Sequence, residues 1–562
     1  MLDAILRKGR QLAEDPVLRR WLLARALGRT PAEPAFTAHR PPYLGDGWSG
    51  LPLEHPQASL PVLPAGRPTG SLALTLAGAR PTIAPGGEPA LVRQRFADLE
   101  TELSLHRFAW VPLMDADADP RWVGTVWQAW CDAHGNPDQS WAWHPYTAAE
   151  RAVNLLTFAA RHGLPEGAET VLAAHAPAIA RGLEWFGDHH TSNHCANNGR
   201  GLYLLGLALG LKQATEAGAR ILLEEGRSIF RPSGVLREAS THYHLLLTRQ
   251  WASVWLAARR HARPEAAEFG ATLRAALAVL PLFDLPGRFP LVGDVSPDCP
   301  PDHLFGLLPG RPAQGWTALL DDADRAALLA LAGDAAPSAE GWLRADHGPW
   351  SGLWHAEPEG WSPMPGHGHQ DCGGAEIHFG GVPVFIDPGR GSYARAGEAD
   401  PFVAGGSHGV LAVDGLDPYP QNRPYYDPAF RMAMAGPALL APTESGVRLV
   451  HHGYARIGLG AVERSWSFAP DRLVIDDWVQ GNGRHRVERR LVTGLDARLA
   501  DDVAILTAAD GRRFRLGAED CACTLAPTVA WAAYGEGRPA QVVTFSADIR
   551  LPWRGRITVE VL

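Results

Sequence analysis

The hydrophobic positions follow different periods in the two halves of the chain. In the first half, segments 147–163, 199–226 and 240–262 carry apolar residues at the three-to-four-residue spacing of an amphipathic helix. Short stretches rich in Gly, Pro, Asn and Asp separate them. Helices of similar length in series predict a helical toroid or a solenoid of helix pairs over 96–335. No repeat of fixed period is visible, so the pattern alone does not choose between the two.

After residues 333–341 the period becomes that of β-strands. Runs of four to eight alternating or β-branched residues occur at 374–381, 382–387, 409–415, 447–454, 462–468, 471–479, 541–547 and 556–562. Turn residues such as Gly380 and Gly381 separate the runs, which predicts an antiparallel β-sandwich or barrel over 345–562. The chain is therefore expected to be a multidomain α+β protein. Residues 1–95 are expected to pack on the helical domain, and a ligand site is expected where the two domains meet.

Composition narrows the class of protein. The 562 residues are 46% hydrophobic, with Lys+Arg 52 against Asp+Glu 61, a formal net charge of −9. Basic blocks are missing from the sequence, so we expect no nucleic-acid partner. No apolar run approaches the roughly 18 residues of a membrane span, and the first 30 residues suggest an amphipathic helix rather than a signal peptide. We therefore expect no integral membrane segment and a cytoplasmic location. The 20 Trp and 23 His are unusual, and Trp suits sugar stacking as well as core packing.

The densest polar cluster lies in the β-half. His367 and His369 are two apart, so in an extended chain their side chains point the same way. Asp387 ends a predicted strand and His408 opens a later one. Imidazoles and a carboxylate on adjacent strands can form a three-ligand zinc site. The alternative is a chance His-x-His with structural hydrogen bonds.

Three polar clusters lie in the helical half. Amide and imidazole donors gather where a helix is predicted to begin, which suits a carboxylate or another anion. A second cluster opens the helix at 240–262, and a third combines Trp, His and Arg in a wall that could stack sugars and pair with acidic groups. Helix capping explains the first cluster equally well, and plain helix packing the third. An aromatic residue at a helix start, as in the second cluster, is more often part of the core than a catalyst. The members are Asn193, His194 and Asn197; Glu238, Tyr243 and His244; and Trp143, His144 and Arg151.

Six stretches that include these clusters follow one another along the chain: 142–154, 192–207, 237–244, 290–298, 366–393 and 407–415. Taken in this order, they resemble the heparinase II/III-like polysaccharide lyases from about residue 96 onward. The resemblance implies an incomplete α/α toroid followed by an antiparallel β-sandwich. It also implies cleavage of an acidic polysaccharide or oligosaccharide by β-elimination at a uronic acid.

The resemblance also implies roles for particular residues. Asn193 and His194 match the pair at the substrate carboxylate, Tyr243 the catalytic tyrosine and His367 the catalytic histidine. One zinc ion is implied in the β-domain, with His369, Asp387 and His408 as its ligands. Substrate contacts are expected from Trp143, His144, Arg151, Asn197, Glu238 and His244.

Several questions stay open at this level. Whether Tyr243 or His367 is the base depends on the uronic epimer. Ser192 stands where the family often has Asn. A glycoside hydrolase would need two opposed carboxylates, of which the helical half suggests only Glu238. A non-catalytic carbohydrate-binding protein of surface-polysaccharide assembly would keep the same architecture, and a homo-oligomer is compatible with the sequence.

Overall fold

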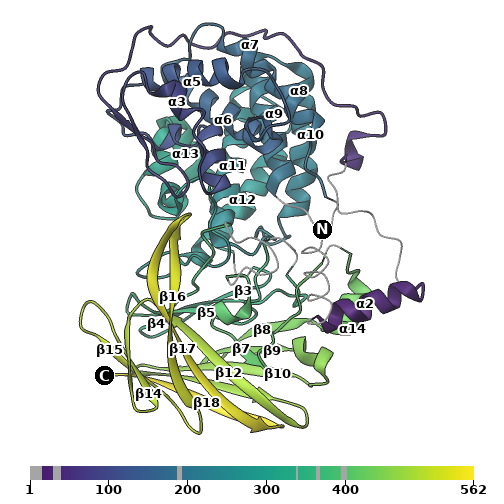
Figure 1. The fold of residues 1–562 in the computed structure, drawn as a ribbon, viewed down its shortest axis with the longest axis vertical. Helices are drawn as coiled ribbons and strands as arrows, with labels where there is room; N and C mark the ends of the chain where they lie inside the picture. The colour runs from purple at the N-terminus through teal and green to yellow at the C-terminus, as the bar shows by residue number, and fades with distance from the viewer. Residues whose placement is uncertain are drawn as a thin grey trace.

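The computed structural model describes residues 15–29, 40–186, 193–336, 339–362, 367–393, 402–423 and 425–562. A helical domain lies against a β-domain built from the second half of the chain (Figure 1). This confirms the α+β architecture of an α/α toroid followed by antiparallel sheets. Ser192 and the first 14 residues of the predicted N-terminal helix lie outside the described residues.

The helical domain is built around long helices that include the periodic segments. Segment 199–226 holds parts of two helices, because Gly210 ends the first with a φ of +71°, a left-handed conformation that glycine adopts readily. The helices are α3 Glu88–Leu91, α4 Leu99–His106, α5 Arg121–His134, α6 Pro145–His162, α7 Ala168–Ala173, α8 His175–Arg181, α9 Asn193–Leu209, α10 Lys212–Ile229, α11 Thr241–Arg260, α12 Ala266–Phe283 and α13 Asp322–Leu331.

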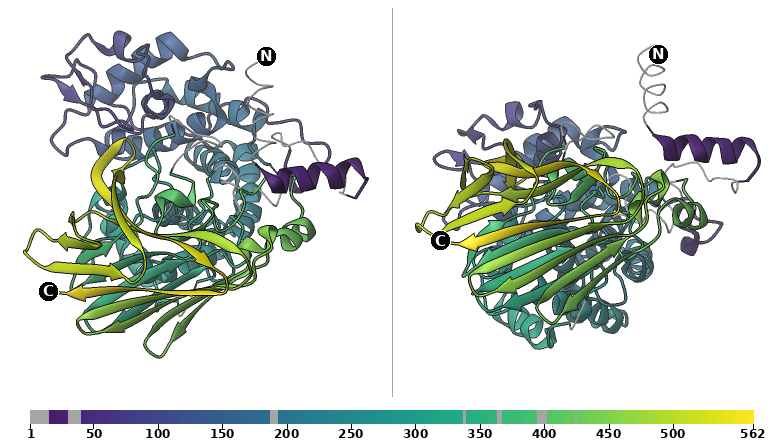
Figure 2. Two further views of the ribbon diagram at one scale, coloured as in Figure 1. Left: turned by 60° about the horizontal axis from the view of Figure 1, so that its bottom comes forward. Right: turned by 90° about the horizontal axis from the view of Figure 1, so that it is seen from below.

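The β-domain consists of antiparallel sheets, as Figure 2 shows from two further sides. The sheet orders are β13-β14-β15-β18-β11-β10-β9-β8, β16-β17-β12-β7 and β3-β4-β5-β6. The strands are β3 Trp342–His347, β4 Trp350–His355, β5 Gly374–Phe379, β6 Val382–Phe385, β7 Leu411–Val413, β8 Ala438–Thr443, β9 Gly446–His451, β10 Val462–Ala469, β11 Arg472–Val479, β12 Arg484–Thr493, β13 Asp496–Ala500, β14 Val503–Thr507, β15 Arg513–Ala518, β16 Ala522–Ala533, β17 Glu536–Arg550 and β18 Trp553–Val561. Buried and half-buried residues alternate along β11, as expected when one face of a sheet covers the core.

The N-terminal segment divides between the two domains, which corrects the expectation that all of it packs on the toroid. Its later part, with β1 Leu72–Ala73 and β2 Thr82–Ile83, joins the core of the helical domain. Helix α2 Pro16–Ala26 instead packs on the β-domain near α14 Pro428–Met434 (Figure 1). Trp21 is buried there, with its ring 4.4 Å from that of Tyr425. The apolar face of α2 therefore covers the β-domain core.

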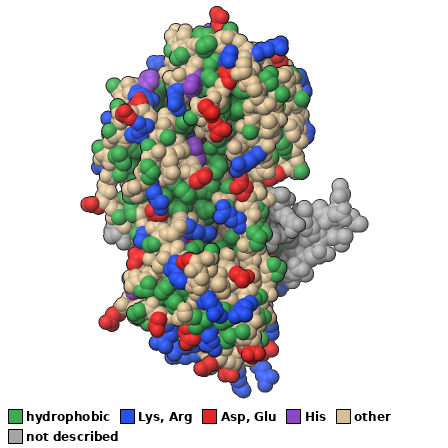
Figure 3. Space-filling model, turned by 90° about the vertical axis from the view of Figure 1, so that its left-hand side faces the viewer, with side chains coloured by type: hydrophobic (Ala, Val, Ile, Leu, Met, Phe, Trp, Pro, Cys, Tyr) green, Lys and Arg blue, Asp and Glu red, His purple; other side chains and the backbone are tan. Residues whose placement is uncertain are grey.

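One helix bears on the expectation that the chain has no integral membrane segment. Among the described residues, α12 is long and apolar enough by length and composition to cross a membrane. Its buried residues, among them Phe269, Leu273 and Leu280, belong to the core of the helical domain. Packing inside the protein therefore accounts for its apolar composition. On the face drawn in Figure 3, acidic and basic side chains are interspersed over both domains.

Candidate active site

A cavity of about 340 Å³ lies where the helical domain meets the β-domain. The N-terminal ends of α6, α9 and α11 open onto it from one side, and loops of the β-domain close the other side. The lining residues are Leu99, Glu100, Leu103, Arg107, Trp141, His144, Tyr146, Glu184, Asn193, His194, Tyr243, Pro297, Asp298, His367, Arg390 and Tyr393. All four predicted catalytic residues are among them.

Tyr243 is held in place by the first turn of α11. The Ser240 hydroxyl caps this helix by accepting a hydrogen bond from the Tyr243 backbone N–H at 3.0 Å. The Tyr243 hydroxyl lies 3.0 Å from that of Tyr393, which comes from the β-domain. Burial raises the pKa of Tyr243 well above its ordinary value of 10, and the Asp294 carboxylate adds to the effect. The phenol is therefore protonated in this arrangement.

His367 reaches the same cavity from the β-domain. Its Nδ1 donates to Asp294 Oδ2 at 2.6 Å, so Nε2, for which the described residues provide no hydrogen-bond partner, is the ring nitrogen left to meet a ligand. Its ring centroid is 6.1 Å from that of Tyr243. Burial alone would lower the pKa of His367, but the hydrogen bond and charge of Asp294 outweigh burial, so the pKa is raised. The phenol and the imidazole thus face one cavity from two domains.

Asn193 and His194 line the cavity at the start of α9. The Asn193 backbone N–H and side-chain amide donate to Glu238 at 2.7 and 3.2 Å, while its buried Oδ1 has no hydrogen-bond partner among the described residues. His194 Nδ1 lies 2.7 Å from Glu184 Oε1. Burial would lower the pKa of His194, but the Glu184 carboxylate outweighs it and raises the pKa. A cationic imidazole beside an amide suits a carboxylate ligand.

Another part of the cavity wall, next to His194, carries an ion pair. Asp298 accepts from Tyr146 Oη at 2.6 Å and from Arg107 Nη1 at 3.0 Å, and Arg107 also reaches Glu100 at 3.0 Å. Trp141 adds a half-exposed indole. This wall therefore combines fixed charges with an apolar surface, as a sugar ring would require.

The structure does not bring every expected substrate contact to the cavity. Trp143 is 3% exposed and packs in the helical core, with its ring 4.6 Å from that of His175. Arg151 lies over the Trp130 ring at 4.0 Å and donates to the Ala142 carbonyl, because helix packing rather than solvent surrounds this face of α6. The other expected contacts away from the cavity surface are Asn197, which binds Arg200; Glu238, which holds Asn193; and His244, which binds the Ala276 carbonyl. Only His144 of the six lines the cavity.

The three predicted metal ligands lie close to one another behind the cavity. His408 Nδ1 is 2.7 Å from Asp387 Oδ2, and the His369 ring is 5.1 Å from the His408 ring. The Nε2 atom of each histidine also has a hydrogen-bond partner: His369 Nε2 lies 2.8 Å from Asp294 Oδ1, and His408 Nε2 lies 3.0 Å from the Phe402 carbonyl.

The types of donor fit zinc, although the spacing differs from that of a formed site. Buried His369 Nδ1 has no hydrogen-bond partner within the described ranges, and the outer partners are those that ligating histidines usually have. Across those ranges, no three His, Cys, Asp or Glu side chains are arranged to hold an ion. The zinc ion therefore stays a prediction.

Sequence reasoning missed several residues that organise the site. Asp294 and Asp298 lie in the stretch 290–298, and Arg390 and Tyr393 lie in 366–393, both noted only for their resemblance. Their roles depend on contacts between domains. The one local signal is that Asp294 follows a glycine, Gly293, whereas Asp298 follows Pro297. This signal is too weak to single out Asp294.

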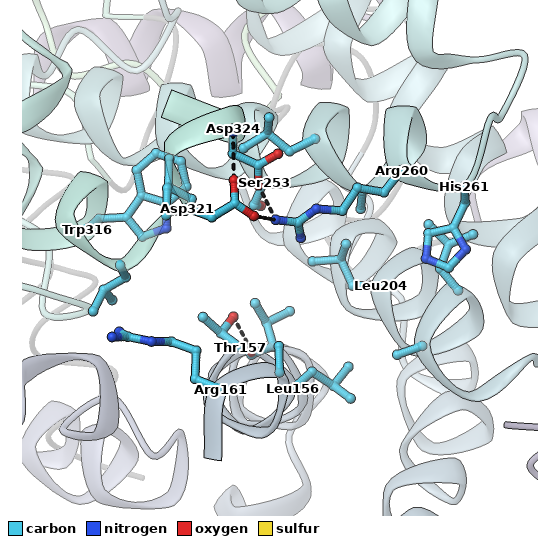
Figure 4. A pocket seen from close by; sticks show the side chains of 18 of the residues that line it. Leu156, Thr157, Arg161, Leu204, Ser253, Arg260, His261, Trp316, Asp321 and Asp324 are labelled. Atoms are coloured by element: carbon cyan, nitrogen blue, oxygen red, sulfur yellow. Dashed lines mark hydrogen bonds and ion pairs between the residues drawn. The ribbon is translucent and has the colours of Figure 1, made fainter. Parts of the chain in front are cut away.

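A larger cavity, of about 510 Å³, lies at the C-terminal ends of the same three helices (Figure 4). Arg161 and Trp316 border it, and Arg260 pairs with Asp321 at 3.2 Å. None of the predicted catalytic residues lines it. The chemistry is therefore concentrated at the N-terminal ends of these helices.

The chain is similar to known lyases in part of its sequence and in its fold. Residues 332–556 match the family model described as Heparinase II/III-like, C-terminal. A search of curated protein sequences finds no match. A crystal structure of heparinase III is 14% identical, with 84% of this chain and 79% of that chain covered and a TM-score of 0.60. A mutant of the heparan sulfate lyase HepC from Pedobacter heparinus is 14% identical, with 84% and 78% covered and a TM-score of 0.52.

These likenesses confirm the resemblance seen in the sequence. At such low identities, the solved structures establish the fold alone, while the family match covers the β-domain. Residues 332–556 therefore match the Heparinase II/III-like, C-terminal family model, and the chain shares the fold of the solved heparinase III and heparan sulfate lyase structures.

Proposed function

We propose that the protein cleaves a uronic-acid-containing polysaccharide or oligosaccharide by β-elimination. One observation carries the proposal: a phenol, an imidazole and an amide–imidazole pair, contributed by two domains, line a single cavity. The similar solved structures are those of heparinase III and a heparan sulfate lyase, which makes glycosaminoglycans the first substrates to test.

The chemistry follows from the groups present. The C5 proton of a uronate is weakly acidic, so charge developing at the carboxylate must be stabilised. His194 is suited to donate a hydrogen bond there, and Asn193 would share its amide hydrogens between Glu238 and the substrate carboxylate. The C5–H bond breaks, its proton passes to a base, and a C4–C5 double bond forms as the C4–oxygen bond breaks. The leaving oxygen takes a proton from an acid. Tyr243, which is protonated, can supply that proton, and His367 is the other group positioned for transfer.

The decisive experiment is a screen of acidic polysaccharides for products that carry the unsaturated bond, read by ultraviolet absorbance. Tyr243→Phe should lower kcat about a hundredfold or more, because it removes the phenolic proton while keeping the ring. Tyr203→Phe is the matched control, since Tyr203 is also buried but binds Glu265, away from the cavity. Products without the double bond would exclude elimination.

Hydrolysis is a second candidate, because Glu184 and Asp298 both line the cavity. A hydrolase needs two opposed carboxylates, one of which must hold a proton. Both groups are engaged, Glu184 with His194 and Asp298 with Arg107 and Tyr146. Saturated products, abolished in Glu184→Gln and retained in Tyr243→Phe, would favour hydrolysis. Ligand binding without any product would favour a non-catalytic role.

We also propose that His369, Asp387 and His408 hold one zinc ion. The buried His369 Nδ1, which has no hydrogen-bond partner in the part of the chain that the structure describes, and the outer hydrogen bonds of both imidazoles support this. A zinc ion would fix the strand ends and loops behind the cavity as a structural site. Mass-spectrometric metal analysis should find one equivalent in the wild type and little in His408→Ala, whereas His451→Ala, another buried histidine of this domain, should keep it. Equal zinc in both variants, or none in the wild type, would contradict the assignment. Cytoplasmic location and oligomeric state stay predictions.

A further inference from the structure

We propose that Asp294 is the positioning residue that holds the catalytic histidine and joins the two halves of the active site. The proposal rests on the function proposed above and adds a residue to which that function assigns no role. Asp294 lies between α12 and the 3-10 helix Pro301–Leu307, and is 2% exposed. It belongs to the helical half, yet its carboxylate binds side chains of the β-domain.

The two carboxylate oxygens of Asp294 accept hydrogen bonds from different histidines. Oδ2 accepts from His367 Nδ1 at 2.6 Å, and Oδ1 accepts from His369 Nε2 at 2.8 Å. Hydrogen bonding at Nδ1 fixes both the orientation of the His367 ring and the nitrogen that carries a proton, so Nε2 is the atom presented to the cavity. A carboxylate can accept from both imidazoles at once, whereas an amide has a single acceptor oxygen.

Asp294 also connects His367 to Tyr243. Tyr393 Oη donates to Asp294 Oδ2 at 3.3 Å and lies 3.0 Å from Tyr243 Oη. A continuous hydrogen-bonded path therefore runs from the imidazole through Asp294 and Tyr393 to the phenol. Arg390 Nη1 approaches the same carboxylate at 3.3 Å and balances its buried charge.

The backbone of Asp294 is anchored on both sides of the domain boundary. Its carbonyl accepts from the Ser240 hydroxyl at 2.6 Å, so it is tied to the start of α11. A parallel bridge pairs Asp294 with Arg390: the Arg390 N–H donates to the Gly293 carbonyl at 3.0 Å, and the Val295 N–H to the Arg390 carbonyl at 2.8 Å. Hydrogen bonds to both domains therefore fix the backbone from which the Asp294 carboxylate extends.

The test compares Asp294→Asn and Asp294→Ala with the wild type, each purified with zinc and checked for folding by thermal unfolding. With a substrate found by the screen above, both variants should lose kcat about a hundredfold or more while KM changes less than about threefold, since a misplaced acid–base group slows the reaction more than it weakens binding. A kcat within about threefold of wild type in a folded variant would overturn the proposal.

Glu376→Gln is the matched control. Glu376 is likewise a buried carboxylate at the domain boundary, bound to Arg288 at 2.7 Å and His378 at 2.9 Å, but it does not line the cavity. This variant should lose stability and keep kcat within about threefold of wild type. Equal loss of kcat in Glu376→Gln and Asp294→Asn would reduce Asp294 to a structural role and overturn the proposal.

A second readout needs no substrate. In nitrogen-15 histidine spectra, the His367 Nδ1–H signal, assigned with His367→Ala, should be protected from solvent exchange in the wild type and lose that protection in Asp294→Ala. An unchanged signal would overturn the positioning role. Lost protection in a protein that forms no unsaturated product would retain that role and count against the proposed lyase reaction instead.

Discussion

Histidine side chains in the helical domain have two kinds of surroundings. His175 and His242 are fully buried, and burial lowers the pKa of His175 well below its usual value and that of His242 to about 3. His194 is buried less completely, and the Glu184 carboxylate reverses the sign of the shift. The neighbours of each ring therefore decide whether a histidine is a neutral packing group or a cationic binding group.

This contrast predicts how substrate affinity depends on pH. The raised pKa of His194 means that its charge is complete below the ordinary histidine value of about 6.5 and is lost as pH rises through the raised pKa. Burial would raise the pKa of Glu184, but His194 outweighs burial and lowers it. The Glu184–His194 ion pair is therefore lost on the acidic side only when pH falls through the lowered pKa of Glu184. Glu238, Arg107 and His144 also face this pair.

We therefore expect KM for a uronate substrate to rise on the alkaline side of neutrality in the wild type. In His194→Gln, KM should be higher at every pH and lack this alkaline rise. Steady-state kinetics across the pH range tests the prediction. The same alkaline rise in both proteins would assign the titration to another group.

At the scale of single elements, helix starts position the chemistry. Tyr146, Asn193 and Tyr243 each lie in the first turn of a long helix, and all three line one cavity. The first turn has unpaired backbone N–H groups, so capping residues determine both the end of the helix and the location of its first side chains. At α11, the Ser240 hydroxyl accepts from the Tyr243 N–H and donates to the Asp294 carbonyl.

Ser240→Ala should therefore affect both stability and catalysis. Loss of the cap should cost about 1 kcal/mol of unfolding free energy. It should also lower kcat, because Tyr243 and Asp294 are then no longer linked through the Ser240 hydroxyl. Asp427→Ala is the control. Asp427 caps α14 by accepting from the Phe430 N–H at 2.9 Å, and it does not line the cavity. Chemical denaturation should show similar losses, with kcat reduced in Ser240→Ala alone; equal kcat in both variants would contradict the link.

At the scale of the whole molecule, buried ion pairs join the domains. Arg288 of the helical half donates to both oxygens of Glu376 in β5, at 2.7 and 3.1 Å. The Glu376 side chain is fully buried, so its charge depends on this partner and on His378. This pair therefore stabilises the interface between the domains, and neither of its residues lines the cavity.

Removing one partner should reveal this dependence. Arg288→Met should lower the unfolding free energy by about 3 kcal/mol, since it leaves a buried carboxylate poorly paired. Arg556→Met at the exposed pair with Asp476 should cost under about 1 kcal/mol. Calorimetry can compare the two, and equal shifts in Tm would show that the interface pair contributes no more than a surface pair.

The spacing of apolar positions was enough to predict the helical half, the β-half and the division of the chain near residues 333–341. The resemblance predicted Asn193, His194, Tyr243 and His367 as site residues, and all four line one cavity. Helix and strand periods depend on local spacing, which a single sequence displays. The fold was needed to show that Trp143 and Arg151 pack in the core while Trp141 and Tyr146 line the cavity. Indole and guanidinium groups serve equally well in a core or a sugar-binding wall, so burial alone distinguishes them. The same holds for Asp294, whose partners come from segments 73 and 96 positions away in the sequence and meet it only when the domains close together.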